Sequence, residues 1–173
     1  MAEESAPVRL ARQSLAHFLA TGEFLPPPSE FSRELSGQAG VFVSLKKEGQ
    51  LRGCIGTFAP TQSTIAGEII RNAVSAGTED PRFWPVEADE LAEIAISVDI
   101  LSAPEPVKDL AELDPQRYGV IVRRGRRSGL LLPDLEGVDT VEAQVGIARQ
   151  KAGLSPEEEV ELYRFSVTRY GKE

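Results

Sequence analysis

The chain has 173 residues, of which 41% are hydrophobic, 27% charged and 6% aromatic, and its net charge is −8. The length fits one domain, and the hydrophobic content excludes an intrinsically disordered chain. No apolar run is long enough to cross a membrane, and the acidic residues 1–5 lack the apolar region of a secretory signal. We therefore expect a cytoplasmic protein, one domain over 1–173, that does not bind membranes.

Hydrophobic periodicity changes between that of helices and that of strands along the first half of the chain. Apolar residues at three- and four-residue spacing indicate helices, and glycines 22 and 77 are suited to end them. Runs rich in β-branched residues on both sides of a glycine-containing turn indicate a hairpin. The expected elements are a helix over about 6–21 capped by Ser5, a hairpin with strands over 40–45 and 51–58, a helix over 61–76, and a short helical turn over 86–91.

The second half begins with the clearest strand, in which isoleucine and valine alternate with small or polar residues. The expected elements are this strand over 93–101, a second hairpin over about 117–133, a helix that opens with a capping box at 139–142 and ends at Gly153, a short helix from Ser155, and a strand over 161–170. The strands pair as hairpins rather than through repeated crossovers. We therefore expect an α+β fold, with a mainly antiparallel sheet flanked by helices.

The densest group of chemistry-bearing residues lies in 51–58, Leu-Arg-Gly-Cys-Ile-Gly-Thr-Phe. In a regular strand, Arg52, Cys54 and Gly56 share one face, opposite Gly53. Because a nearby cation stabilises a thiolate, one interpretation is a reactive or ligand-contacting Cys54. The other interpretation is a small buried side chain in a strand kinked by glycines.

The loop 79–85, Glu-Asp-Pro-Arg-Phe-Trp-Pro, is the second candidate region. Aromatic and arginine side chains on loops recur at binding sites, so Glu79, Asp80, Arg82 and Trp84 are candidates for contact with a polar ligand or a partner. The structural alternative is a turn at Asp80, an ion pair of Arg82 with a carboxylate, and aromatic side chains that fill the core.

A third region is basic. Five arginines occur between 117 and 127 with no acidic residue among them, and four of these lie in 123–127, near the turn expected in the second hairpin. One interpretation is contact with RNA or phosphate. The alternative is a solvated turn, or contact with an acidic surface of this or another protein. The acidic chain as a whole argues against binding nucleic acid over its entire surface.

The chain has one cysteine, Cys54, and one histidine, His17. A zinc site of cysteine and histidine needs three or four ligands, and the spacings of phosphate-binding glycine loops do not occur. We expect no metal centre and no cofactor. His17 falls beside the apolar stripe of the first helix, so we expect it at the surface or partly buried rather than in catalysis.

The octapeptide 51–58 resembles the signature of the AMMECR domain family. The resemblance covers about residues 8–170 and includes these further stretches: 40–45, 68–76, 80–83, 93–101, 118–122 and 130–142. It implies an α+β domain with a larger and a smaller subdomain, intertwined along the chain, and a cleft between them. Carried onto this sequence, the signature marks the motif Arg-Gly-Cys-Ile-Gly, residues 52–56, as the candidate site, but it implies no particular reaction.

The same resemblance implies a cellular setting. Prokaryotic members resemble protein A of the AmmeMemoRadiSam system, which accompanies, or is fused to, a Memo-like protein and a radical-SAM protein. These two proteins are therefore the expected partners.

Three functions follow as hypotheses. The first is an accessory component that binds a partner or a small ligand through the face of Arg52 and Cys54 and the loop after the second helix. The second is an enzyme acting on a small substrate, with Cys54 as nucleophile, Arg52 lowering the thiol pKa or binding an anion, and Asp80 or Glu79 as acid or base. The third is RNA binding through Arg123–Arg127 of the second hairpin.

Overall fold

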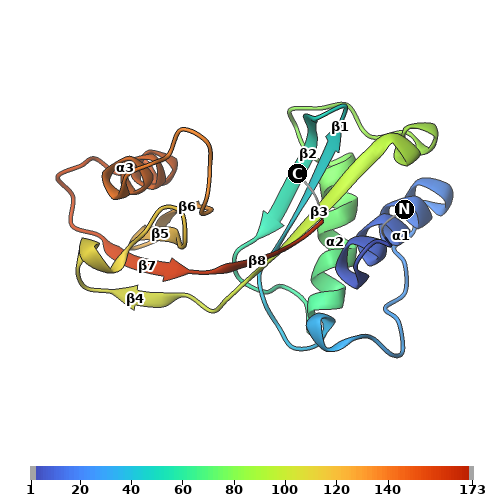
Figure 1. The fold of residues 1–173 in the computed structure, drawn as a ribbon, viewed down its shortest axis with the longest axis horizontal. Coiled ribbons are helices and arrows are strands. Elements are labelled where there is room, and N and C mark those ends of the chain that lie inside the picture. The colour runs from blue at the N-terminus through green and yellow to red at the C-terminus, as the bar shows by residue number, and fades with distance from the viewer. Residues whose placement is uncertain (1–2, 172–173) are drawn as a thin grey trace. The chain divides into compact units, whose positions relative to one another are not determined.

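The computed structural model describes residues 3–171, which fold into two compact units (Figure 1). Unit 1 is formed by residues up to Ile100 and from Thr168 onward, and unit 2 by Leu101–Val167. The chain therefore leaves unit 1, completes unit 2, and returns to unit 1 for its last strand. Each unit has its own sheet and its own hydrophobic core.

Unit 1 is a four-stranded sheet with helices on one face (Figure 1). Its strand order is β2-β1-β3-β8, and α2 packs on β1 and β2 while α1 packs on α2. Its elements are α1 (Ala6–Thr21), η1 (Arg33–Leu35), β1 (Val41–Lys47), β2 (Gln50–Thr57), α2 (Ile65–Thr78), η2 (Ala88–Glu93), β3 (Ile94–Leu101) and β8 (Val167–Tyr170), where η denotes a 3₁₀ helix. The core is made where alternate apolar residues of β1 and β3 meet the apolar stripes of both helices.

Unit 2 is an antiparallel sheet of order β4-β7-β5-β6 with α3 packed against β5 and β6. Its elements are β4 (Glu105–Val107), η3 (Leu110–Glu112), β5 (Gly119–Arg124), β6 (Arg127–Leu131), α3 (Val141–Ala152) and β7 (Glu161–Phe165). The α+β class, with antiparallel strands flanked by helices, is confirmed, although there are two sheets rather than one.

The second helix starts later than its periodicity predicts. It begins at Ile65 rather than residue 61, because the Thr64 hydroxyl caps it by accepting the N–H of Gly67. Gly77 does not end the helix. It lies inside α2, where a Cβ would meet the side chain of Leu15, so it allows α1 and α2 to approach closely.

The expected strand over 161–170 is divided between the two sheets. β7 and β8 are separated at Ser166, whose N–H donates to Ser102 Oγ and whose carbonyl accepts the N–H of Ser102. The short helix predicted from Ser155 does not form. The N–H of Ser155 donates to the Glu158 carboxylate at 2.8 Å, and the segment closes as a turn.

The start of the third helix differs from the prediction, and β4 is a strand that was not predicted. α3 is capped by Thr140, which accepts the N–H of Ala143, and it ends at Gly153 in the left-handed conformation. β4 contains Pro106, although proline disfavours strand formation because it has no backbone N–H to donate. It is nevertheless a strand because it lies at the sheet edge, where a missing N–H costs least.

Candidate functional site

The motif strand β2 contains a bulge at Arg52. Pairing with β1 proceeds from Gly53 directly to Leu51, so Arg52 is the extra residue. A bulge reverses the alternation of side chains at that point. Arg52 and Gly53 therefore point toward the helix-covered side of the sheet, and Cys54 points to the other side. The expectation that Arg52 and Cys54 share a face is wrong.

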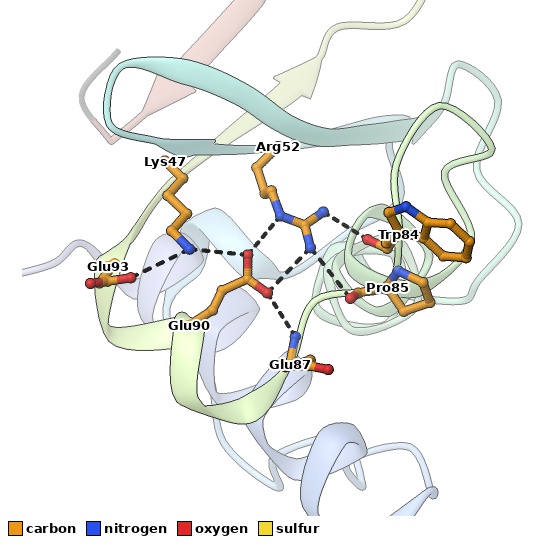
Figure 2. A network of polar contacts seen from close by, with 7 residues as sticks. All are labelled: Lys47, Arg52, Trp84, Pro85, Glu87, Glu90 and Glu93. Carbon is orange, nitrogen blue, oxygen red and sulfur yellow. Dashed lines mark hydrogen bonds and ion pairs between the residues drawn. The ribbon is translucent and has the colours of Figure 1, made fainter.

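Arg52 is the centre of a network that fixes the loop before η2 (Figure 2). Its Nε donates to Glu90 Oε1 at 2.7 Å and its Nη2 to Glu90 Oε2 at 3.2 Å, a two-point ion pair. Nη1 donates to the carbonyl of Trp84 at 2.8 Å, and Nη2 to that of Pro85 at 3.3 Å. Arg52 thus binds a carboxylate and two backbone carbonyls of the same segment.

Glu90 is held by two further groups. Its carboxylate accepts the N–H of Glu87 at 3.0 Å and lies 3.4 Å from Lys47 Nζ, which also pairs with Glu93 (Figure 2). Hydrogen bonds from Arg52, and then from the backbone of Glu87, lower the pKa of Glu90 to about 2. The Arg52–Glu90 pair therefore stays charged at neutral pH.

Trp84 lies at the surface of this segment. Its side chain is 88% exposed, and Figure 2 shows the indole turned away from the Arg52 network. The structural alternative, in which the aromatic side chains of the loop fill the core, is wrong for Trp84. Because Arg52 holds the carbonyls of Trp84 and Pro85, the backbone that carries the exposed indole is fixed.

Asp80 connects the loop to the outer edge of β2. Only 5% exposed, it accepts the N–H of Cys54 at 3.0 Å and is bound by the Arg82 guanidinium at 2.8 and 3.1 Å. Arg82, together with the backbone N–H groups of Cys54 and Arg82, holds the pKa of this carboxyl well below its usual range, although burial opposes the shift. An acid or base at neutral pH works best with a pKa near 7, so the assignment of Asp80 to that role gains no support. Glu79 is exposed and accepts a hydrogen bond from Ser75.

Cys54 is half-buried, and its Sγ lies 3.3 Å from Ser44 Oγ. Asp80 links Cys54 to a cation, Arg82 rather than Arg52, because the same carboxylate accepts the Cys54 N–H and binds the Arg82 guanidinium. Hydrogen bonding to Asp80 raises the pKa of Arg82, although burial opposes the shift. Opposite Ser44, on β3, lies Ser97, so three small polar side chains form a row across the sheet.

The two glycines of the motif serve close packing. A Cβ at Gly53 would meet the backbone carbonyl of Ala76 in α2, and one at Gly56 would meet the ring of Phe42. Both positions therefore require glycine for reasons internal to unit 1.

Glu68 was not among the residues singled out from the sequence. It is fully buried on α2 and accepts hydrogen bonds from the Thr57 hydroxyl at 2.7 Å, from the N–H of Gln62 at 2.6 Å, and from both the N–H and hydroxyl of Thr61. Asn72, one turn along, donates to Thr57 at 3.1 Å. Their place in the helix could have indicated this role, because Glu68 and Asn72 fall on the apolar stripe of α2.

Three of the four arginines of the second hairpin have partners within unit 2. The turn itself holds only Gly125 and Arg126, and the other three arginines lie in strands. Their contacts are Arg123 with Glu161 at 3.7 Å, Arg124 with the carbonyl of Glu159 at 2.8 Å, and Arg127 with Glu158 at 2.9 Å. These contacts fit the interpretation in which the cluster faces an acidic surface of the same protein.

His17 is partly buried on α1, as expected. Among residues 3–171, histidine, cysteine, aspartate and glutamate side chains form no group of three that could hold a metal ion. Within that same range, no helix combines the length and apolar character needed to cross a membrane.

Two units, each with an antiparallel sheet and helices packed against it, place this chain among the α+β proteins. The chain belongs to the AMMECR1 family, whose profile matches residues 8–170. It is 51% identical over 173 residues to a protein of Thermotoga maritima, covering 98% of this chain and 99% of that protein.

Two further matches are a longer protein and a solved structure. The chain is 52% identical over 170 residues to a Clostridium acetobutylicum protein, covering 97% of this chain but 36% of that protein. The crystal structure of an uncharacterised protein from Pyrococcus horikoshii matches with a TM-score of 0.87 and 33% identity, covering 96% of this chain and 90% of that one.

Proposed function

We propose that this chain is an accessory component that docks a partner protein through Trp84 and the loop 79–85. The observation that carries the proposal is an 88% exposed tryptophan on a backbone held by Arg52. Exposed tryptophan and arginine side chains are enriched among residues that dominate binding energy. A fixed backbone also reduces the ordering cost of association.

The expected partners are a Memo-like protein and a radical-SAM protein, as the family resemblance implies. The Clostridium acetobutylicum relative supports an association with further protein, since this chain matches only 36% of its length.

The chain provides its own probe, because Trp84 is its single tryptophan. The chain labelled with 5-fluorotryptophan gives one ¹⁹F resonance, which is followed while a purified Memo-like or radical-SAM protein from the same genome is added. We expect a shift or broadening of this resonance. By calorimetry we expect Trp84→Ala to weaken binding at least about tenfold, roughly 1.4 kcal/mol.

The matched control is Leu110→Ala, which removes another exposed apolar side chain, in unit 2. It should leave the affinity unchanged. An unchanged ¹⁹F resonance with both partners, or equal losses in the two variants, would overturn the proposal.

A second candidate, the Cys54-dependent enzyme, is favoured by two observations: Cys54 is not fully buried, and Asp80 links its backbone N–H to the Arg82 guanidinium. Its test is the rate of Cys54 alkylation against pH, with urea-unfolded protein as reference. Fast labelling with a midpoint well below about 8.5 supports it. Labelling only after unfolding removes it.

A further inference from the structure

Unit 2 contains a pocket of its own. Its volume is about 250 Å³, and all its lining residues belong to unit 2. The polar lining consists of Ser102, Glu105, Arg117, Tyr118, Arg164 and Ser166.

Two guanidinium groups converge on one aromatic ring in this pocket. The Cζ atoms of Arg117 and Arg164 lie 5.1 and 4.5 Å from the centre of the Tyr118 ring. The backbone of Tyr118 is fixed on both sides, since its N–H donates to the carbonyl of Asp114 at 2.8 Å and its carbonyl accepts Nε2 of the buried Gln144 at 2.9 Å. These two hydrogen bonds fix the backbone position from which the ring contacts both guanidinium groups.

Guanidinium N–H groups in this pocket lack a hydrogen-bond acceptor among residues 3–171. Arg164 uses Nε on Glu105 at 3.3 Å and Nη1 on the carbonyl of Glu112 at 2.8 Å, and no bond from its Nη2 occurs in residues 3–171. Arg117 contacts the Tyr118 ring, but within the described chain its guanidinium has neither an ion pair nor a hydrogen bond. By contrast, Arg123 and Arg127 of the hairpin pair with Glu161 and Glu158.

We propose that this pocket binds the phosphate group of a small phosphorylated molecule. Two arginines against one carboxylate, which is already paired, leave a net positive charge beside the hydroxyl of Ser166. Guanidinium groups donate in a planar fork that suits the several acceptor oxygens of a phosphate. The volume accommodates a small molecule rather than a polymer.

The test is a ¹H–¹⁵N NMR titration of the full chain with inorganic phosphate at constant ionic strength. We expect saturable shifts of the amides of Ser102, Ala103 and Glu105 and of those in 117–119 and 164–166, with a Kd on the order of 1–10 mM for the bare ion. Acetate at the same ionic strength should bind at least about tenfold more weakly. Shifts that stay linear with phosphate concentration, or equal affinity for acetate, would overturn the proposal.

Substitutions of single arginines distinguish a specific phosphate site from nonspecific electrostatic attraction. Arg117→Ala should weaken phosphate binding about tenfold or more, and Arg117→Lys should restore only part of it, because lysine keeps the charge but loses the fork. The matched control is Arg126→Ala, which removes an exposed arginine from the hairpin turn and should leave Kd unchanged. Equal weakening by Arg126→Ala and Arg117→Ala would show nonspecific attraction and contradict the proposal.

This site is independent of the proposed docking through Trp84, which lies in unit 1. Either proposal can fail without the other.

Discussion

Glu90 illustrates how a single carboxyl links the motif strand to the exposed tryptophan. Its pKa falls from the ordinary 4.5 to about 2, chiefly through the hydrogen bonds from Arg52. A carboxyl with a lowered folded-state pKa stabilises the protein above its unfolded-state pKa, and this contribution disappears as pH falls through the folded-state value. For Glu90 the loss occurs between about pH 4.5 and 2.

Glu90→Gln should therefore destabilise the protein at pH 7, by roughly 1–3 kcal/mol, since it leaves Arg52 half-buried without a charged partner. The measurement is urea denaturation of both proteins at a series of pH values. The difference in free energy of unfolding should shrink as pH falls from 4.5 to 2, because Glu90 of the natural chain becomes neutral too. A difference that is constant over this range would contradict the prediction.

At the scale of elements, the glycines of the motif decide how closely β2 and α2 approach. Gly53→Ala places a methyl group against the Ala76 carbonyl, and backbone cannot move aside as a flexible side chain can. We expect a loss of about 1–3 kcal/mol in the free energy of unfolding, measured by chemical denaturation.

The matched control is Gly146→Ala in α3, where a Cβ meets open space. This change should be neutral or stabilising by up to about 1 kcal/mol, because alanine is the better helix former. Similar losses in the two variants would indicate that general glycine replacement, rather than the contact with Ala76, sets the cost.

Elements also show which predictions depend on local information. The helix over about 6–21 and the strand near 93–101 are confirmed to within a residue or so, since hydrophobic periodicity is local. The predicted cap is wrong, because Ser5 occupies the N-cap position but its hydroxyl makes no capping hydrogen bond. The division of 161–170 at Ser166 depends on hydrogen bonds with Ser102, which is 64 residues away in sequence. No local pattern contains that information.

For the whole molecule, the charge distribution bears on nucleic-acid binding. The chain carries a net −8, and the hairpin arginines are paired with Glu158 and Glu161. We expect binding to single-stranded RNA to be weaker than about 10 μM at 150 mM salt, measured by filter binding. Glu158→Gln should strengthen it, because it frees Arg127. Sub-micromolar binding by the natural chain would instead support RNA as the ligand of the hairpin.

The candidate site was predicted in part. The segment around Cys54 and the loop 79–85 do lie together, because Asp80 accepts the N–H of Cys54. The partner of Arg52, which is Glu90, was not predicted, and neither was the role of Glu68 as the acceptor for the loop after β2. Both contacts cross between elements, so spacing along the chain does not show them.

The sequence by itself determined the α+β class, most of the elements and the family, since these depend on local periodicity, turn chemistry and a contiguous motif. Tertiary structure decided which face each motif residue occupies. One bulge at Arg52, visible only in the pairing of β2 with β1, turns its guanidinium away from Cys54 and onto Glu90. The physical reason is that side-chain direction in a strand depends on the register with its neighbour, and a single inserted residue reverses it.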